Sequence, residues 1–156
     1  MDRFNEEIYG KVLWECYRSK VYIVTLSLMY VLLGAVAVIW AMDKDQFLFY
    51  VLAVVVIFFC LWRINRVHHP VALICEKKLL VAVPWSFFTF DYYITFRALY
   101  MPVVYKDVAG VSSRWNHLYI GGREEGGLVS LPVQLAYVSR DGKYDFQNWV
   151  ESKQCE

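Results

Sequence analysis

The sequence predicts a membrane α-helical hairpin followed by a small α+β domain, an antiparallel β-barrel or sandwich closed by a C-terminal helix. Three observations lead to this fold class. Two long apolar runs, separated by a short polar segment, occupy the first half of the chain. Short β-prone stretches with turn signals follow, and an amphipathic stretch comes last. We expect an N-terminal amphipathic helix over 1–20, the hairpin over 21–66 and a β-rich cytosolic domain over 67–156.

In the N-terminal segment, Phe4, Ile8, Val12 and Cys16 recur every fourth residue. This spacing places them on one face of a helix. We expect residues 1–20 to form an amphipathic helix that rests on the membrane surface or packs on the cytosolic domain. A docking helix for a partner protein is the alternative.

Both apolar runs are predicted to span a membrane. Residues 21–42 carry no charge and, at about 1.5 Å per residue, cross a hydrocarbon core of roughly 30 Å. Residues 47–62 are fewer, but Gln46 and Ile64 extend them and Arg63 can reach the headgroups. The alternatives are buried helices of a soluble protein and a cleaved signal peptide. Both fit poorly, because the domain is small and a second run follows the first.

The basic residues predict the orientation of this hairpin. Four Lys and Arg residues precede the first run, only Lys44 lies between the runs, and Arg63 and Arg66 follow the second. We therefore expect both termini in the cytoplasm and the turn between the runs on the other side of the membrane. The absence of Asp, Glu, Lys, Arg and His from the runs argues against a channel or transporter made of this hairpin alone.

Beyond residue 66, the pattern changes to short β-prone stretches, and a glycine-bounded hairpin loop is expected over 121–127. Near the end, Asp141 is a candidate helix cap, and Phe146, Trp149 and Val150 share one helical face. This helix is expected to close one end of the β domain. The predicted strands cover residues 71–75, 79–83, 87–90, 92–96, 101–105, 108–112, 118–120 and 128–131.

The segment 104–111 reads Val-Tyr-Lys-Asp-Val-Ala-Gly-Val, and residues 118–120 and the pair Leu131-Pro132 follow it before the final helix. In this order, after a membrane hairpin, the segments resemble the PH-like domain of the YcxB-like bacterial membrane proteins. The resemblance implies a membrane-anchored PH-like barrel without established chemistry. It also implies that Tyr105, Val108 and Val111 contribute to the barrel core.

Motifs for catalysis or cofactor binding are missing from the sequence. It contains no nucleophile elbow, zinc-protease motif or phosphate-binding loop. His68, His69 and His117 have no zinc-type spacing to the cysteines, and the scattered Asp residues fit turns and caps. We expect no enzyme activity, no cofactor and no metal. The cysteines are expected to be free thiols.

An aromatic segment is the remaining surface feature. A small barrel cannot bury all of these rings, so some are expected at the membrane interface or in a protein-binding patch. The candidate interface residues are Trp85, Phe87, Phe88, Phe90, Tyr92, Tyr93 and Trp115.

Taken together, these features and the resemblance predict a non-enzymatic, membrane-anchored interaction or regulatory module in a bacterial inner membrane. Its partner is expected to be a protein, bound in part through a strand edge, or a second copy of the chain. An immunity protein that protects the membrane from a bacterial toxin is one alternative, and an accessory subunit of a membrane enzyme or transporter is another. Residues 67–156 hold as many basic as acidic side chains, which argues against a nucleic-acid partner.

Overall fold

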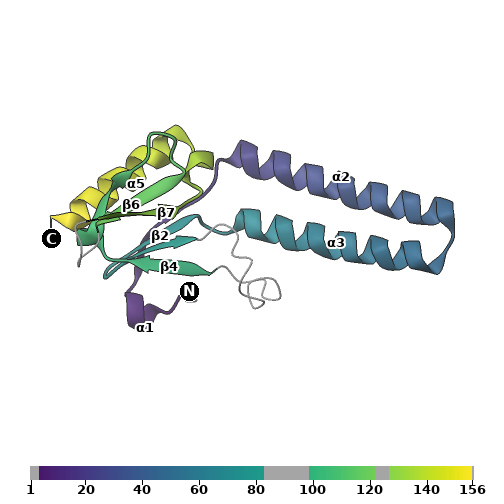
Figure 1. The fold of residues 1–156 in the computed structure, drawn as a ribbon, viewed down its shortest axis with the longest axis horizontal. Helices are drawn as coiled ribbons and strands as arrows, with labels where there is room; N and C mark the ends of the chain where they lie inside the picture. Colours follow the sequence, from purple (N-terminus) through teal and green to yellow (C-terminus); the bar gives the residue numbers. More distant parts are fainter. Residues whose placement is uncertain (1–3, 83–98, 122–126, 156) are drawn as a thin grey trace. The chain divides into compact units, whose positions relative to one another are not determined.

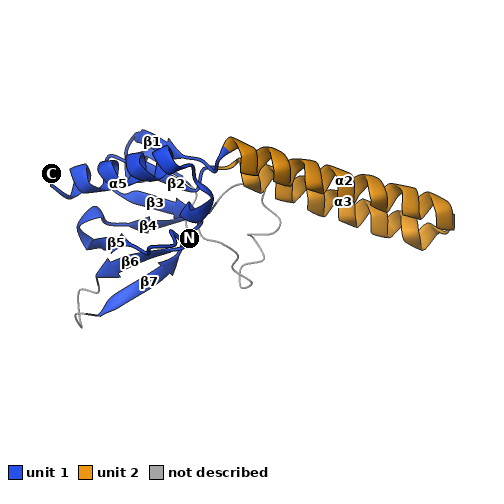
Figure 2. Ribbon diagram, turned by 90° about the horizontal axis from the view of Figure 1, so that it is seen from above, with its two compact units in different colours: residues 1–19, 70–156 blue, residues 20–69 orange. Residues whose placement is uncertain are grey.

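A computed structural model describes residues 4–82, 99–121 and 127–155 of the chain. The chain divides into two compact units, shown in Figure 2. Residues 20–69 form the hairpin unit, and residues 1–19 together with 70–156 form the sheet unit. The coarse prediction of two long apolar helices, an antiparallel sheet domain and a C-terminal helix is confirmed.

The hairpin unit consists of helix α2 (Lys20–Lys44) and helix α3 (Phe47–His68), which run antiparallel (Figure 1). Both are long and apolar enough to cross a membrane, judged by length and composition. Helix α3 ends two residues beyond residue 66, the predicted end of the hairpin. It stops before His69, whose backbone is extended because Pro70 disfavours a helical conformation in the residue before it.

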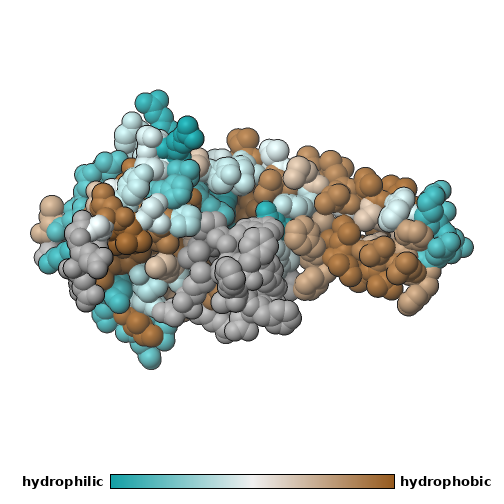
Figure 3. Space-filling view, in the orientation of Figure 1, coloured by the Kyte–Doolittle hydropathy of each residue, from teal (hydrophilic) through white to brown (hydrophobic). Residues whose placement is uncertain are grey.

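Small side chains line part of the contact between the two helices, and the ring pairs Tyr30–Phe59 and Trp40–Phe49 also lie across it. Ala41 on α2 and Ala53 and Cys60 on α3 are buried. A Cβ atom added to Gly34 would lie 4.0 Å from Cγ1 of Ile57, so this glycine faces α3. The side chains on the other faces are largely exposed, and large apolar residues dominate them (Figure 3). Such small-residue seams allow close helix packing in lipid.

The first sheet of the sheet unit contains four strands, β1 (Val12–Cys16), β2 (Ala72–Cys75), β3 (Leu79–Ala82) and β4 (Tyr100–Val103). They are antiparallel and lie in the order β1-β2-β3-β4. Strands β2 and β3 are almost completely buried, as expected for short continuous apolar runs.

The second sheet contains three antiparallel strands, β5 (Val108–Val111), β6 (His117–Gly121) and β7 (Leu128–Pro132). The sequence predicted a barrel or a sandwich, and the barrel is wrong, because the described strands form two sheets that are not closed into a barrel. A 3-10 turn at Tyr105–Asp107 separates β4 from β5 and directs the chain out of the first sheet. The Tyr105 hydroxyl donates a hydrogen bond to the Cys75 carbonyl over 2.6 Å, which holds this turn against β2.

One core cluster joins both sheets to helix α5 (Arg140–Gln154). Tyr105, Val108 and Phe146 are buried in it, and Val111 and Trp149 pack against it. The helix and its cap begin two residues earlier than the predicted Asp141 cap implies. Its cap is Ser139, whose hydroxyl accepts a hydrogen bond from the Gly142 N–H over 3.2 Å.

The N-terminal segment differs from the predicted helix over 1–20. Only α1 (Glu6–Tyr9) is helical, and Val12–Cys16 pairs with β2 as strand β1. Gly10, with φ +78°, ends the helical turn. In β1, a bulge between Val12 and Trp14 places Cys16 in the core cluster shared by both sheets and Val12 against a second cluster that contains Tyr9 and Leu73. A spacing of four is also a multiple of two, so an apolar residue at every fourth position fits a regular strand as well as a helix. The apolar pattern therefore could not distinguish the two structures.

Candidate functional site

Most of the predicted aromatic interface lies outside the described residues. This applies to Trp85, Phe87, Phe88, Phe90, Tyr92 and Tyr93, and to the predicted strands 87–90 and 92–96.

Trp115 is the member of that set that the structure places. It follows β5 in a turn where its N–H donates to the Ser112 carbonyl over 2.9 Å. Its φ of +58° is uncommon for a bulky residue. The Ser112 hydroxyl holds this turn by accepting the N–H groups of Asn116 and His117 over 3.2 and 3.1 Å. The indole ring packs against the edge of the core.

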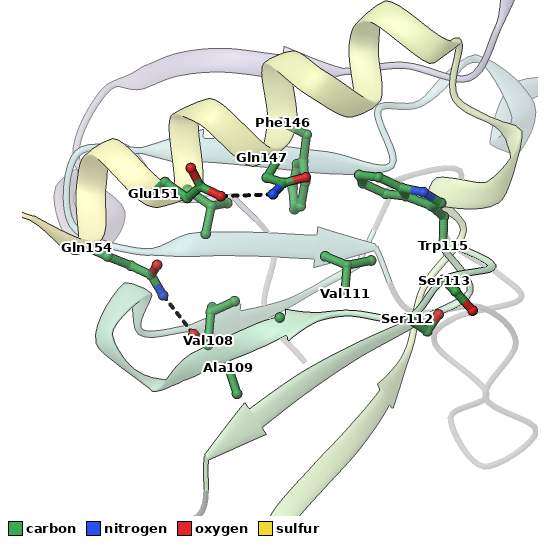
Figure 4. A pocket seen from close by; sticks show the side chains of 12 residues that line it. Val108, Ala109, Val111, Ser112, Ser113, Trp115, Phe146, Gln147, Glu151 and Gln154 are labelled. Atoms are coloured by element: carbon green, nitrogen blue, oxygen red, sulfur yellow. Dashed lines mark hydrogen bonds between the residues drawn. The ribbon is translucent and has the colours of Figure 1, made fainter.

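Trp115 lies at one end of a groove between strand β5 and helix α5 (Figure 4). The groove encloses a volume of about 350 Å³. This is within the range of about 300–1,000 Å³ that is usual for ligand pockets. Helix α5 supplies the polar side chains of one wall, Gln147, Glu151 and Gln154. The apolar lining consists of Val108, Val111, Trp115, Phe146 and Val150.

Strand β5 presents a free edge to this groove. Among the strands that the structure describes, it is the outer strand of its sheet and pairs only with β6. The Ser112 N–H bonds to the His117 carbonyl over 2.9 Å, so by alternation the N–H and C=O of Val111 point away from β6. A bulge between Val108 and Gly110 shifts the register, and Gly110 has a positive φ of +154°.

Gln154 closes the groove at the start of β5. Its side-chain amide donates to the Val108 carbonyl over 2.7 Å and to the Tyr105 carbonyl over 3.0 Å. These bonds hold the start of β5 against α5, and the bond to Val108 occupies one main-chain acceptor of the strand. The main-chain groups of β5 around Val111 remain accessible to an added strand.

A second cavity of about 480 Å³ adjoins the first, because Trp115 and Gln147 line both. Arg140 and Lys143 make it basic. The Lys143 ammonium donates to the Ala136 carbonyl over 3.1 Å and lies 5.7 Å from the centre of the Trp115 ring. The two cavities together form one site, which we call the β5–α5 groove.

Sequence reasoning selected the buried face of the final helix but missed the groove residues beside it. Gln147, Glu151 and Gln154 lie at i, i+4 and i+7, so they share a second face next to that of Phe146 and Val150. A helical wheel of this segment shows that polar face. The sequence does not predict that β5 lies opposite the face, because β5 precedes the helix by some thirty residues.

Within the residues that the structure describes, no cluster of three His, Cys, Asp or Glu side chains is arranged to hold a metal ion. His68 Nδ1 lies 2.8 Å from the Ile64 carbonyl, and His69 Nε2 lies 3.3 Å from the Asn65 side chain. His117 pairs with Pro132 in the second sheet. These contacts are structural.

The four cysteines are free thiols, and only Cys155 is exposed. Burial raises the pKa of Cys16 from 9.0 to about 12, and burial raises that of Cys75 to about 11. Since the thiolate is the reactive form, we expect a maleimide reagent at neutral pH to modify Cys155 in the native protein and Cys16 and Cys75 only after unfolding. Mass spectrometry of labelled peptides checks this, and rapid native labelling of Cys16 would contradict it.

The raised pKa of Cys16 also predicts a pH dependence of stability. The folded state favours the neutral thiol, so the stabilising contribution is complete below pH 9. It is lost as the pH rises from 9 towards 12, where the unfolded chain ionises first. A Cys16→Ser variant should lack this part of the alkaline destabilisation in unfolding measurements.

Comparison with protein-family models, curated proteins and solved structures finds no match to this chain.

Proposed function

We propose that this protein is a non-enzymatic, membrane-anchored interaction module whose β5–α5 groove binds an extended segment of a partner protein. The observation that carries the proposal is the free edge of β5, which faces α5 across an apolar-lined groove. An added strand gains main-chain hydrogen bonds from such an edge and side-chain specificity from the pockets beside it. No catalytic step is part of the proposal.

In this proposal, α2 and α3 cross a bacterial inner membrane and the sheet unit lies in the cytoplasm. The exposed apolar faces support the spanning role, since Val21 and Phe47 are 77% and 84% exposed and would face lipid. Charge supports the orientation. Lys20 begins α2 and Arg63 and Arg66 end α3, whereas the turn between the helices carries two Asp residues and one Lys. The YcxB-like resemblance agrees with this arrangement.

Site-specific photocrosslinking in intact bacterial cells tests the binding site. Gln147 and Asn148 are adjacent, exposed residues of α5, but only Gln147 lines the groove. A photoreactive phenylalanine in place of Gln147 is expected to give a discrete crosslinked product with one protein. The same amino acid in place of Asn148 is the matched control and should give little of this product.

The crosslinked protein also distinguishes the functional classes. A toxin as the product would specify an immunity function, a membrane enzyme or transporter would specify an accessory subunit, and a second copy of the chain would specify self-association. Absence of a product at Gln147, or equal products at both positions, would contradict the groove as the binding site.

A further inference from the structure

The two ends of the β5–α5 groove carry opposite charge. Arg140 and Lys143 line the end near Trp115, whereas Glu151 lines the part towards Gln154. In the described part of the chain, none of these three charged side chains forms a salt bridge. Glu151 instead accepts a hydrogen bond from the Gln147 side chain over 2.8 Å, on the groove side of α5 (Figure 4). The charges thus remain available to an occupant.

The spacing of these charges matches an extended peptide. Lys143 and Glu151 are eight residues apart on one helix, which places them about 12 Å apart along its axis. Four residues of a β-strand cover about 13 Å. Residues i and i+4 of a strand point to the same face, as does residue i+2 between them. One strand can therefore place a charged residue at each end and an apolar residue over the lining formed by Val111, Phe146 and Val150.

The direction of β5 decides the order of the charges. Its first residue, Val108, bonds to Gln154 at the end of α5, whereas the turn after β5 places Trp115 beside Lys143 near the start of the helix. Strand and helix are thus antiparallel. All strand pairs that the structure describes are antiparallel. A strand added antiparallel to β5 runs from the basic end of the groove to the acidic end.

We propose that the groove binds an extended protein segment, which pairs antiparallel with β5. In this segment an acidic residue is followed two positions later by an apolar residue and four positions later by a basic residue. This inference rests on the proposed function and specifies the chemistry of its partner. The acidic side chain meets Arg140 and Lys143, the apolar one fills the lining, and the basic one meets Glu151. Charges at the rim of a site set register and specificity more than affinity.

Two peptides of identical composition test the order of charges. The forward peptide, Ser-Glu-Thr-Ile-Thr-Lys-Ser with blocked ends and a fluorescent label, is titrated with the full chain in detergent micelles and followed by anisotropy. The reversed peptide exchanges Glu and Lys. We expect the forward peptide to bind about tenfold more tightly at low salt, since two attractions replace two repulsions. The ratio should shrink at high salt because the charges are exposed.

A charge reversal at one exposed residue assigns the acidic end. Glu151→Lys should weaken binding of the forward peptide and strengthen binding of a variant peptide with Glu at both charged positions. Glu6→Lys, an exposed reversal in α1, is the matched control and should change neither affinity. Both substitutions are at exposed sites, and circular dichroism verifies that each variant is folded.

The outcomes separate this inference from the function on which it rests. Equal affinity of the forward and reversed peptides, tighter binding of the reversed one, or no binding of either would overturn the proposed charge order. If Gln147 still gives its crosslinked product in cells in any of these cases, the groove remains a protein-binding site. If Gln147 gives no crosslinked product, both the groove as a binding site and the proposed charge order are contradicted.

Discussion

Replacing Phe146 by alanine is expected to lower the free energy of unfolding of the sheet unit by about 3–5 kcal/mol. Phe146 is 1% exposed and is the largest side chain of the fully buried set. It projects from α5 into the cluster that both sheets share. Truncation removes its buried apolar surface and leaves a cavity where helix and sheets meet, and the surrounding strands can close that cavity only in part.

Thermal unfolding of the full chain in detergent measures this effect. A loss of that size lowers the midpoint temperature of thermal unfolding of the sheet unit by roughly 12 °C or more. Tyr144→Ala is the matched control, since Tyr144 is an aromatic residue of the same helix but is 55% exposed. Its effect should stay within about 1 kcal/mol. Equal effects of the two substitutions would mean that α5 does not close the core.

An arginine in place of Val55 is expected to reduce membrane integration of the chain strongly. Val55 lies in the middle part of α3 and is 59% exposed. If α3 spans the membrane, this side chain faces lipid near the centre of the bilayer. There an arginine costs about 2.5–3.5 kcal/mol on the insertion scale, which is roughly a hundredfold change in the insertion equilibrium.

Alkaline extraction of bacterial membranes, followed by detection of the tagged protein, measures integration. Val129→Arg is the matched control because Val129 is 60% exposed but belongs to β7 of the sheet unit. We expect Val129→Arg to remain in the membrane fraction and Val55→Arg to be released or degraded. If both variants stay integrated to the same extent, α3 does not cross the bilayer in the proposed way.

Several elements of the fold are encoded locally and were therefore predictable. The runs that became α2 and α3 are apolar over their whole length, so no distant partner is needed to identify them. The same applies to β2 and β3, which are continuous apolar stretches on either side of a polar turn. On α5, the spacing of Phe146 and Val150 gives its buried face.

Other elements depend on contacts between residues far apart in the chain. Strand β1 forms because Val12–Cys16 pairs with Ala72–Cys75, whereas its apolar spacing fits a helix equally well. The separation of two sheets depends on the turn at Tyr105–Asp107, where Tyr105 bonds back to Cys75. Strand patterns identify strands, but they do not state which strand pairs with which.

The sequence by itself determined the two apolar helices, most of the strands and the buried face of the final helix, because helical and strand periodicities are properties of neighbouring residues. Only the tertiary structure decided that residues Val12–Cys16 form a strand and that the described strands belong to two sheets. It also decided that β5 lies opposite Gln147 and Glu151, which creates the groove. These features arise from hydrogen bonds and packing between distant segments, and no local pattern contains them.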